Sequence, residues 1–546
     1  MFAWTFSWTD ILLLLGAIVG LIFYLKTKAY YDFFEKRGVK SIKPYPIIGN
    51  MLPLVLGKEH INVIIQNVYN ISKGDKVCGL YNFTRPALVL NDLDLIKRIT
   101  IKDFDHFTDH AQPPAEVGPL FSYNLFSLTG EKWHSMRSIL SPAFTGSKMK
   151  EMMPLVDECT EHFIQYLKKE SDSPSVKNGK GYMELEVKEL LSKLANDVIA
   201  SCAFGLQSDS FKDPDNQFNT MSKSAVDIKL KALLKLLPVM IIPVLGKLVK
   251  VNLMEDEVAN YYRSLVIGII KERNKSGFIR RDMIHLLMLA MKGSLHEENA
   301  AENVHEDNIG FATVAEDLKG MNSGKRVWKD DEITAQAVIF LFAGYETIST
   351  TLSFMLYELA LDPDVQTKLR EEIDQYIEET GGMIKYNDIR NLAYMDMVMS
   401  ETLRMWPPVG SLDRVCVKDY TLPIKINNQP YVVKKGELVM IPIRAIQRDE
   451  QYYTDPNKFI PERFSEENKG SIHPETFLPF GIGPRSCIGN RFAIMETKIV
   501  LFHLLANFEI IQTAKTEIPL KIKSHTFNLH TVNGTWLGLK RRSNEN

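Results

Sequence analysis

Apolar residues along most of this chain recur at the three- and four-residue spacing of amphipathic helices, and short apolar runs bounded by turn residues are few. From about Glu131 the helical spacing dominates until about Leu422. The pattern from Asp331 to Ala360 predicts one long helix. Ala87–Leu90 is the clearest strand candidate, and the residues from Asp94 onward predict a helix. The pattern therefore predicts a mainly α chain.

The N-terminus departs from this pattern because it is almost entirely apolar. Met1–Leu25 carries a single charge, Asp10, and Ile11–Leu25 is unbroken apolar or small. With Phe2–Trp8 the segment approaches the ~20 residues that span a bilayer. A cleaved signal peptide is the alternative, but no basic residue precedes the apolar run and no small-residue cleavage site follows it. We expect residues 1–27 to be a transmembrane signal anchor.

The next segment, residues 28–46, is basic and then rich in proline. Basic residues follow the apolar run closely, namely Lys26, Lys28, Lys36, Arg37, Lys40 and Lys43. By the positive-inside rule they keep the body of the protein on the cytosolic side of the membrane. Lys43–Pro46 is too proline-rich for a helix and predicts a stiff connector. With this topology the Asn-x-Ser/Thr sequences stay unglycosylated; they begin at Asn70, Asn82, Asn274 and Asn533.

Two later segments interrupt the helical pattern. Leu230–Val251 is apolar with interspersed lysines and with Pro238 and Pro243, which argue against a second membrane span. An element lying in the membrane interface and a lid packed on the domain are both consistent with it. Gly293–Lys329 is polar and mildly acidic, and it predicts a flexible surface loop.

Composition narrows the class of protein. The 546 residues are 45% hydrophobic and 24% charged, which is ordinary for a globular chain. A net charge of −2 argues against general nucleic-acid binding. The five cysteines are odd in number and widely spaced, which indicates a reducing compartment. We expect four of them to be small buried hydrophobes, namely Cys78, Cys159, Cys202 and Cys416.

The fifth cysteine, Cys487, lies in the glycine-flanked loop Phe480–Gly489. Gly483 and Gly489 lack a Cβ, so the backbone can turn tightly and approach a flat cofactor. The residues after Cys487 predict a helix, whose N-terminal N–H groups and dipole stabilise a thiolate. Arg485 offers a cation to a carboxylate. Cys487 is therefore a candidate metal ligand, and an inert buried cysteine is the alternative.

A second candidate site lies within the long predicted helix, at Ala343-Gly344-Tyr345-Glu346-Thr347. Gly344 costs about 1 kcal/mol relative to Ala in a helix interior, so a reason for its presence is worth seeking. A missing side chain would let a small ligand approach. Thr347 can bond to the carbonyl of Ala343 and open the helix locally. Glu346 and Thr347 could pass protons inward, although buried helices often contain such residues.

Two further pairs of residues are spaced so that both members of each pair would lie on the same face of a helix. Glu401 and Arg404 are three residues apart, and a surface ion pair of little energy is the simple alternative. Trp133 and Arg137 are four residues apart, although Trp133 alone would more often be a core residue.

The loop Phe480–Gly489 follows the pattern Phe-x-x-Gly-x-Arg-x-Cys-x-Gly and resembles the haem-binding loop of the cytochromes P450. The other motifs occur in the order of that family, so the resemblance runs from the proline-rich connector to this loop. The details are most similar to the microsomal branch that contains vertebrate drug-oxidising and insect detoxification enzymes. The resemblance implies one mainly α domain, residues 47–546, with a small β region on its N-terminal side.

The same resemblance implies roles for individual residues. Cys487 would be the proximal ligand of the iron of haem b, and Thr347 with Glu346 would deliver protons for oxygen activation. Ile348 departs from the family, where a second Thr or Ser is common. Glu401, Arg404 and a third member, Arg463, would form a structural triad. Residues expected to contact the haem or its propionates are Trp133, Arg137, Ala343, Gly344, Arg414, Phe480, Gly483, Arg485 and Gly489.

The implied activity is insertion of one oxygen atom from O2 into a lipophilic small molecule. Electrons would come from a membrane-bound NADPH-dependent flavoprotein reductase, docked by basic residues such as Lys132, Lys148 and Lys150. The expected location is the endoplasmic reticulum membrane, facing the cytosol. Apolar candidates for the substrate cavity are 121–126, 339–343, 409–411 and 527–529. A haem-thiolate isomerase acting on peroxides and a non-enzymatic haem sensor or carrier remain alternatives.

Overall fold

The computed structural model describes residues 8–113, 115–177, 179–227, 230–293, 311–314, 328–389, 391–524 and 529–542. The chain forms two compact units. The first contains residues 1–115, 235–249 and 411–442, and the second contains residues 116–234, 250–410 and 443–546. The boundaries predicted at residues 27 and 46 separate the anchor, the connector and the catalytic domain, which is a different division from these two units. Those boundaries remain predictions.

The first unit is built on a four-stranded sheet in the order β1-β2-β7-β4. Its strands are β1 (Val77–Asn82), β2 (Arg85–Leu90), β7 (Leu438–Ile441) and β4 (Leu412–Val415). Strand β2 confirms the predicted strand Ala87–Leu90; it pairs antiparallel with β1 and parallel with β7. Helix α3 (Ile61–Ile71) supplies Ile65 and Val68 to a core that includes Cys78 and Val89. Burial of these apolar side chains fixes which face of the sheet is covered.

Other elements of this unit are short, apart from the N-terminal helix. They are α1 (Trp8–Tyr31), α2 (Leu52–Val55), α4 (Leu93–Lys97) and the hairpin of β5 (Tyr420–Ile426) and β6 (Gln429–Val433). Helix α1 covers most of the predicted anchor, whose insertion in a membrane remains a prediction. The hairpin turns at Asn427 and Asn428, both with positive φ, which asparagine tolerates better than most residues.

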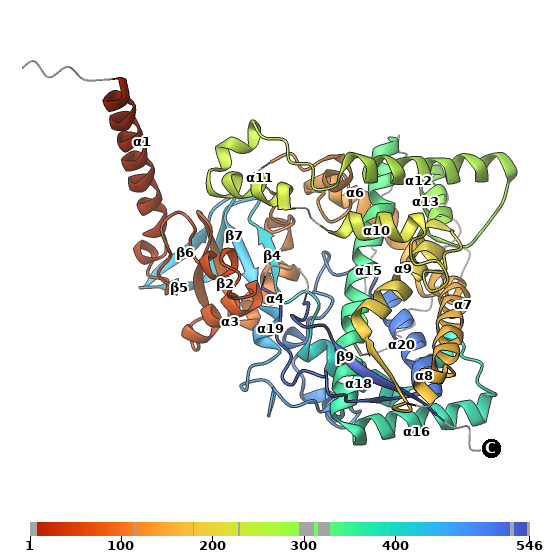
Figure 1. The fold of residues 1–546 in the computed structure, drawn as a ribbon. Helices are drawn as coiled ribbons and strands as arrows, with labels where there is room; N and C mark the ends of the chain where they lie inside the picture. Colours follow the sequence, from red (N-terminus) through yellow and green to blue (C-terminus); the bar gives the residue numbers. More distant parts are fainter. Residues whose placement is uncertain are drawn as a thin grey trace, which may run out of the picture. The chain divides into compact units, whose positions relative to one another are not determined.

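Helix α15 (Asp330–Leu361) runs through the second unit with α9 (Val187–Phe204) packed along it (Figure 1). It confirms the long helix predicted for 331–360. Of the described residues, only α15 forms a helix long and apolar enough to span a membrane, and 67% of its most apolar window is buried inside the protein. We therefore interpret α15 as a core helix. It ends where Asp362 caps the next helix, which begins at Pro363.

The remaining helices of the second unit surround this pair. The longer ones are α6 (Gly130–Leu140), α7 (Gly146–Ser171), α10 (Gln217–Val226), α12 (Asp256–Ser276), α13 (Met283–Lys292), α16 (Pro363–Thr380), α18 (Ala393–Met405) and α20 (Asn490–Asn507). The short ones are α5 (Pro119–Ser122), α8 (Pro174–Lys177), α17 (Tyr386–Ile389) and α19 (Ile443–Ile446). A sheet in the order β3-β9-β8 joins Met183–Glu186, Trp536–Arg541 and Phe508–Ile511. The predicted excess of helix over strand is confirmed.

The two segments that interrupt the helical pattern, 230–251 and 293–329, differ in how much of each the structure describes. Leu230–Val251 forms α11 (Leu230–Ile241) and a 3-10 helix at Pro243–Lys247, and its relation to a membrane remains a prediction. Most of 293–329 lies outside the described residues. Within it, residues 311–314 are packed on the second unit, and Ala312 is only 3% exposed. A surface loop is therefore the wrong prediction for these four residues, because an apolar pair, Phe311-Ala312, interrupts the polar run.

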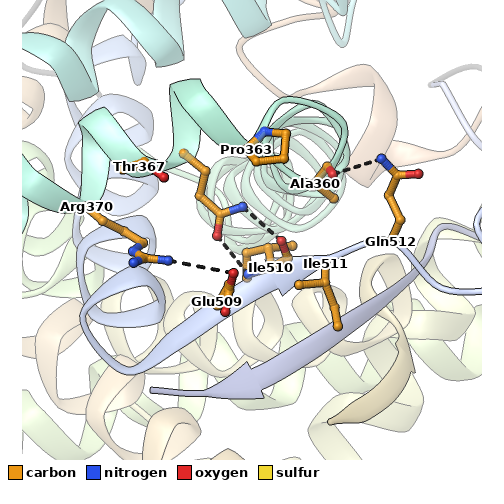
Figure 2. A pocket seen from close by; sticks show the side chains of 9 residues that line it. Ala360, Pro363, Thr367, Arg370, Glu509, Ile510, Ile511 and Gln512 are labelled. Carbon is orange, nitrogen blue, oxygen red and sulfur yellow. Dashed lines mark hydrogen bonds and ion pairs between the residues drawn. The ribbon is translucent and has the colours of Figure 1, made fainter. Parts of the chain in front are cut away.

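One pocket of the second unit lies where α15 ends, α16 begins and β8 passes (Figure 2). Gln366 crosses it, donating to the carbonyls of Leu359 and Ile510 and accepting from the N–H of Ile510. The pocket, about 200 Å³ in volume, is smaller than typical ligand sites and contains none of the predicted site residues. We interpret it as a structural junction.

Candidate active site

The loop around Cys487 is shaped by two glycines with left-handed backbone. Gly481 and Gly483 have φ of 73° and 76°, which residues with a Cβ rarely adopt. The N–H of Cys487 donates to the carbonyl of Phe480 over 2.8 Å, which closes the loop. Helix α20 begins at Asn490, as predicted, and the Cys487 side chain is exposed at its start. The loop thus presents a thiol next to the positive end of a helix dipole.

Gly489 has a different reason than Gly483 for lacking a side chain. Its φ is −92°, and an added Cβ would meet only Phe144, at 3.8 Å. The expectation that Gly489 serves a tight turn is therefore wrong for the backbone itself. A close approach by a bound cofactor remains the prediction for this position.

Three of the residues predicted to contact the cofactor lie close together at the loop, namely Trp133, Arg137 and Arg485. Trp133 and Arg137 lie on α6, as predicted, and they are 1% and 5% exposed. Arg137 donates from Nη1 to the carbonyl of Ser486 over 3.0 Å. The Arg485 guanidinium carbon lies 4.2 Å from the Trp133 ring centroid, in cation–π geometry. Arg485 also donates to the carbonyls of Phe126 and Leu128, so its side chain is held in place.

Arg414 lies on β4 in the first unit and is completely buried. Its Nη1 donates to the carbonyl of Asp413 over 2.7 Å, while Nε and Nη2 have no hydrogen-bond partner among the described residues. Burial lowers the pKa of Arg414 to about 10, so the group is still protonated at neutral pH. A buried cation with unused donors is costly unless an anion joins it.

The middle of α15 carries the second candidate site. Thr347 donates from Oγ1 to the carbonyl of Ala343 over 2.5 Å, as predicted. Phe340 and Thr347 are partly accessible and Ala343 is exposed, although the helix is largely buried on both sides of this stretch. Positions 340, 343 and 347 lie on one face of a helix. The helix is therefore accessible along this stripe, beside Thr347.

Gly344 is not part of this stripe. The structure shows a packing contact at this glycine that the sequence did not predict. A Cβ built on Gly344 would collide with Cδ1 of Ile199 and lie 2.9 Å from its Cγ1. The missing side chain therefore accommodates α9. Packing against Ile199 gives a reason for this glycine that the sequence did not suggest, and its predicted contact with a cofactor stays a prediction.

Glu346 has two nitrogen-bearing partners, Lys188 and His530, that the sequence did not predict. Its Oε2 lies 3.2 Å from Nζ of Lys188 on α9 and 3.1 Å from Nε2 of His530. Burial by itself would raise the pKa of this carboxyl, but the hydrogen bond from His530 and the charge of Lys188 lower it to about 2. Lys188 also donates to Oγ of Ser349 over 2.5 Å. Glu346 is thus an anion at neutral pH, held between two proton-bearing groups.

Glu401 and Arg404 form a buried pair, so a surface ion pair is the wrong alternative. Both side chains are 0% exposed, and two bonds of 2.6 and 2.8 Å join them. Arg463 adds a third contact, 3.3 Å from Nε to Oε1 of Glu401. Gln447, which the sequence analysis missed, accepts the N–H of Leu478 and donates to the carbonyl of Arg404. The triad is therefore linked to the start of the cysteine loop.

Each unit, taken by itself, contains residues with the chemistry that a haem group requires. An exposed thiol at a helix start suits an iron ligand. Arg414 has unused buried donors, and arginine forks match carboxylates such as propionates. The accessible stripe of α15 offers an apolar surface for a flat ring.

Comparison with known proteins agrees with this chemistry. The model of the family "Cytochrome P450" matches residues 39–537 as one domain. The chain is 43% identical to cytochrome P450 9e2 of Blattella germanica, over 100% of this chain and 99% of the relative. It is 37% identical to probable cytochrome P450 9f2 of Drosophila melanogaster, over 97% and 99%. The chain belongs to the cytochrome P450 family, the haem-thiolate monooxygenases.

Proposed function

We propose that this protein is a membrane-bound monooxygenase that inserts one oxygen atom from O2 into a lipophilic small molecule, using electrons from an NADPH-dependent flavoprotein reductase. The observation that carries the proposal is the exposed Cys487 thiol at the start of α20, in a loop held by Arg137. The cofactor would be haem b, with Cys487 as its iron ligand. When bound, the haem supplies the oxygen-activating redox chemistry.

The protein supplies ligation, orientation and protons. Arg137, Arg485 and Arg414 would hold the propionates, and Trp133 would pack beside them. Thr347 would donate a proton from Oγ1 toward the accessible stripe of α15. Glu346 is a carboxylate at neutral pH and carries no proton of its own, so it would accept one from Lys188 or His530 and pass it on to Thr347.

The substrate would bind along apolar side chains of the second unit. Phe121 and Phe342 pack with ring centroids 5.2 Å apart, and Phe144 and Phe340 lie 5.5 Å apart. Such surfaces favour lipophilic molecules. A xenobiotic substrate is our proposal, because the chain resembles the branch that contains insect detoxification enzymes. Residues 527 and 528 of the last predicted wall segment, 527–529, lie outside the described residues.

We further propose that α1 anchors the protein in the endoplasmic reticulum membrane and that the catalytic body faces the cytosol. Glycan mapping in cells tests this topology, because an occupied Asn70 or Asn274, both exposed, would contradict it. Lys132 and Lys150 are exposed and available for a reductase. Lys148 is only 3% exposed, so its predicted docking role is wrong.

The first test is the spectrum of the reduced, carbon-monoxide-bound protein. A strongly red-shifted Soret band in the wild type and its loss in Cys487→Ala would establish the thiolate. Product formation that requires NADPH and reductase would exclude the isomerase and the sensor. The presence of both an acid and an alcohol, Glu346 and Thr347, favours the monooxygenase over the isomerase, which needs no external protons. Turnover without reductase would contradict the proposal.

A further inference from the structure

A four-residue segment, Phe311–Val314, is fixed to the part of the second unit that carries the cysteine loop. The Phe311 ring packs against Phe464 at 5.1 Å and Phe477 at 5.5 Å between centroids, and those two rings lie 4.9 Å apart. Such aromatic contacts stabilise by apolar burial and by ring geometry. Phe477 lies three residues before the start of the cysteine loop at Phe480. The ring of Phe311 therefore connects the segment to the residues that lead into that loop.

A polar contact reinforces this aromatic one. The N–H of Phe311 donates to Oδ2 of Asp396 over 2.8 Å. Oδ1 of Asp396 lies 2.9 Å from Nζ of Lys498, a side chain that is 0% exposed. The N–H of Phe311 therefore donates to the carboxylate of a partly buried ion pair that joins α18 to α20. A hydrogen bond to a charged acceptor is stronger than one to a neutral acceptor.

Val314 makes the contact that reaches the cysteine. Oδ1 of Asn490 accepts the N–H of Val314 at 3.3 Å, and Nδ2 lies 3.5 Å from the Val314 carbonyl. The same Nδ2 donates to the carbonyl of Cys487 over 2.9 Å. The Asn490 side chain is 1% exposed, so its amide is shielded from water. One side chain thus joins the docked segment to the backbone of the cysteine.

We propose that Asn490 is a positioning residue for the Cys487 thiolate and that Phe311–Val314 fixes the orientation of its amide. Partners one step away from a metal ligand orient it and tune its basicity. With Val314 in place, the Asn490 amide keeps its N–H on the Cys487 carbonyl. Without it, the amide can rotate and the cysteine loop loses a buried support. This inference rests on the proposed role of Cys487 as the iron ligand.

Phe311→Ala is the sharpest test because the contacts of Phe311 are with Phe464, Phe477 and Asp396, and it acts on Cys487 only through the segment that it holds in place. The readout is the rate at which the red-shifted band of the reduced, carbon-monoxide-bound protein disappears on mild warming. We expect Phe311→Ala and Asn490→Ala each to raise this rate about three- to tenfold, the factor that corresponds to one net hydrogen bond. The double variant should be no faster than the faster single variant, because both act through one linkage.

Phe211→Ala is the matched control. Phe211 is also half-buried and packs against two rings, Phe163 at 5.2 Å and Tyr166 at 5.0 Å, and both of these rings belong to α7. It should lower the unfolding temperature like Phe311→Ala and leave the band loss at the wild-type rate. Equal band-loss rates in the two variants would overturn the inference.

A second variant covers the case in which Phe311→Ala does not fold. Asn490→Asp keeps an acceptor for the N–H of Val314 and removes the donor to Cys487. We expect faster band loss, with unchanged hydrogen-exchange protection of the Phe311 and Val314 amides. A wild-type band-loss rate in Asn490→Asp would overturn the inference. Absence of the band in the wild type would instead overturn the proposed function, so the two failures are distinguishable.

Discussion

The carboxylate of Glu346 and the imidazole of His530 meet with 3.1 Å between Oε2 and Nε2. One lies in the middle of the core helix α15 and the other near the C-terminus of the chain. Because Glu346 is largely buried, this contact and the one to Lys188 decide the charge of the carboxyl. The acid that the family resemblance assigns to proton delivery is thus controlled by residues outside its motif.

Replacing His530 by Gln should raise the pKa of Glu346 from about 2 toward its ordinary 4.5. A pKa depressed in the folded state contributes stability that is complete above pH 4.5 and is lost as the pH falls toward 2. We therefore expect His530→Gln to lower the free energy of unfolding by about 1 kcal/mol at pH 7, less than the full shift because Lys188 remains. The difference from wild type should shrink between pH 4.5 and 2, as measured by urea unfolding.

His473→Gln is a suitable control for that experiment. Its imidazole is 56% exposed and pairs with Glu475 at 2.8 Å, so water screens much of the interaction. We expect a smaller change in unfolding free energy at neutral pH. A His530→Gln difference that stays constant between pH 4.5 and 2 would contradict the assigned linkage.

Breaking the buried pair of Glu401 and Arg404 should abolish haem incorporation rather than alter the products. Removing one partner leaves a buried charge and typically costs about 3–5 kcal/mol. In Arg404→Ala, the carbonyls of Gln447 and Pro456 also lose their donor. The ratio of haem to protein in purified Glu401→Gln and Arg404→Ala measures the effect. Normal haem content with changed products would refute a structural role.

The contact between Gly344 and Ile199 can be tested by a double variant. Gly344→Ala improves helix propensity by about 1 kcal/mol, but its Cβ collides with Ile199 and overpacking costs about 1–3 kcal/mol. We expect net destabilisation in chemical unfolding. Ile199→Ala removes the colliding atoms, so the double variant should be more stable than the sum of the single effects predicts. Additive effects would mean that Gly344 is not required by α9.

Sequence periodicity and turn chemistry predict the elements that local rules control. The strand at Ala87–Leu90, helix α15 and the helix after Cys487 follow from patterns within each segment. Lys188 and His530 could not be predicted, because their contacts with Glu346 join distant parts of the chain. On α9, Lys188 looks like any solvent-facing lysine of an amphipathic helix. The Phe311-Ala312 pair did carry a signal, since an apolar pair inside a polar run suggests a docking point.

Arg414 gives the most direct test of cofactor fit. In the protein alone, its buried guanidinium has unused donors, so Arg414→Leu should leave the stability of the haem-free fraction unchanged or higher. Haem retention should fall about ten- to a hundredfold, since a hydrogen-bonded charge contributes about 1.5–3 kcal/mol. Haem transfer to an acceptor protein measures the loss. Arg485→Leu, which removes donors to the Phe126 and Leu128 carbonyls, should lower both stability and retention. Unchanged retention in Arg414→Leu would mean that its free donors serve another group.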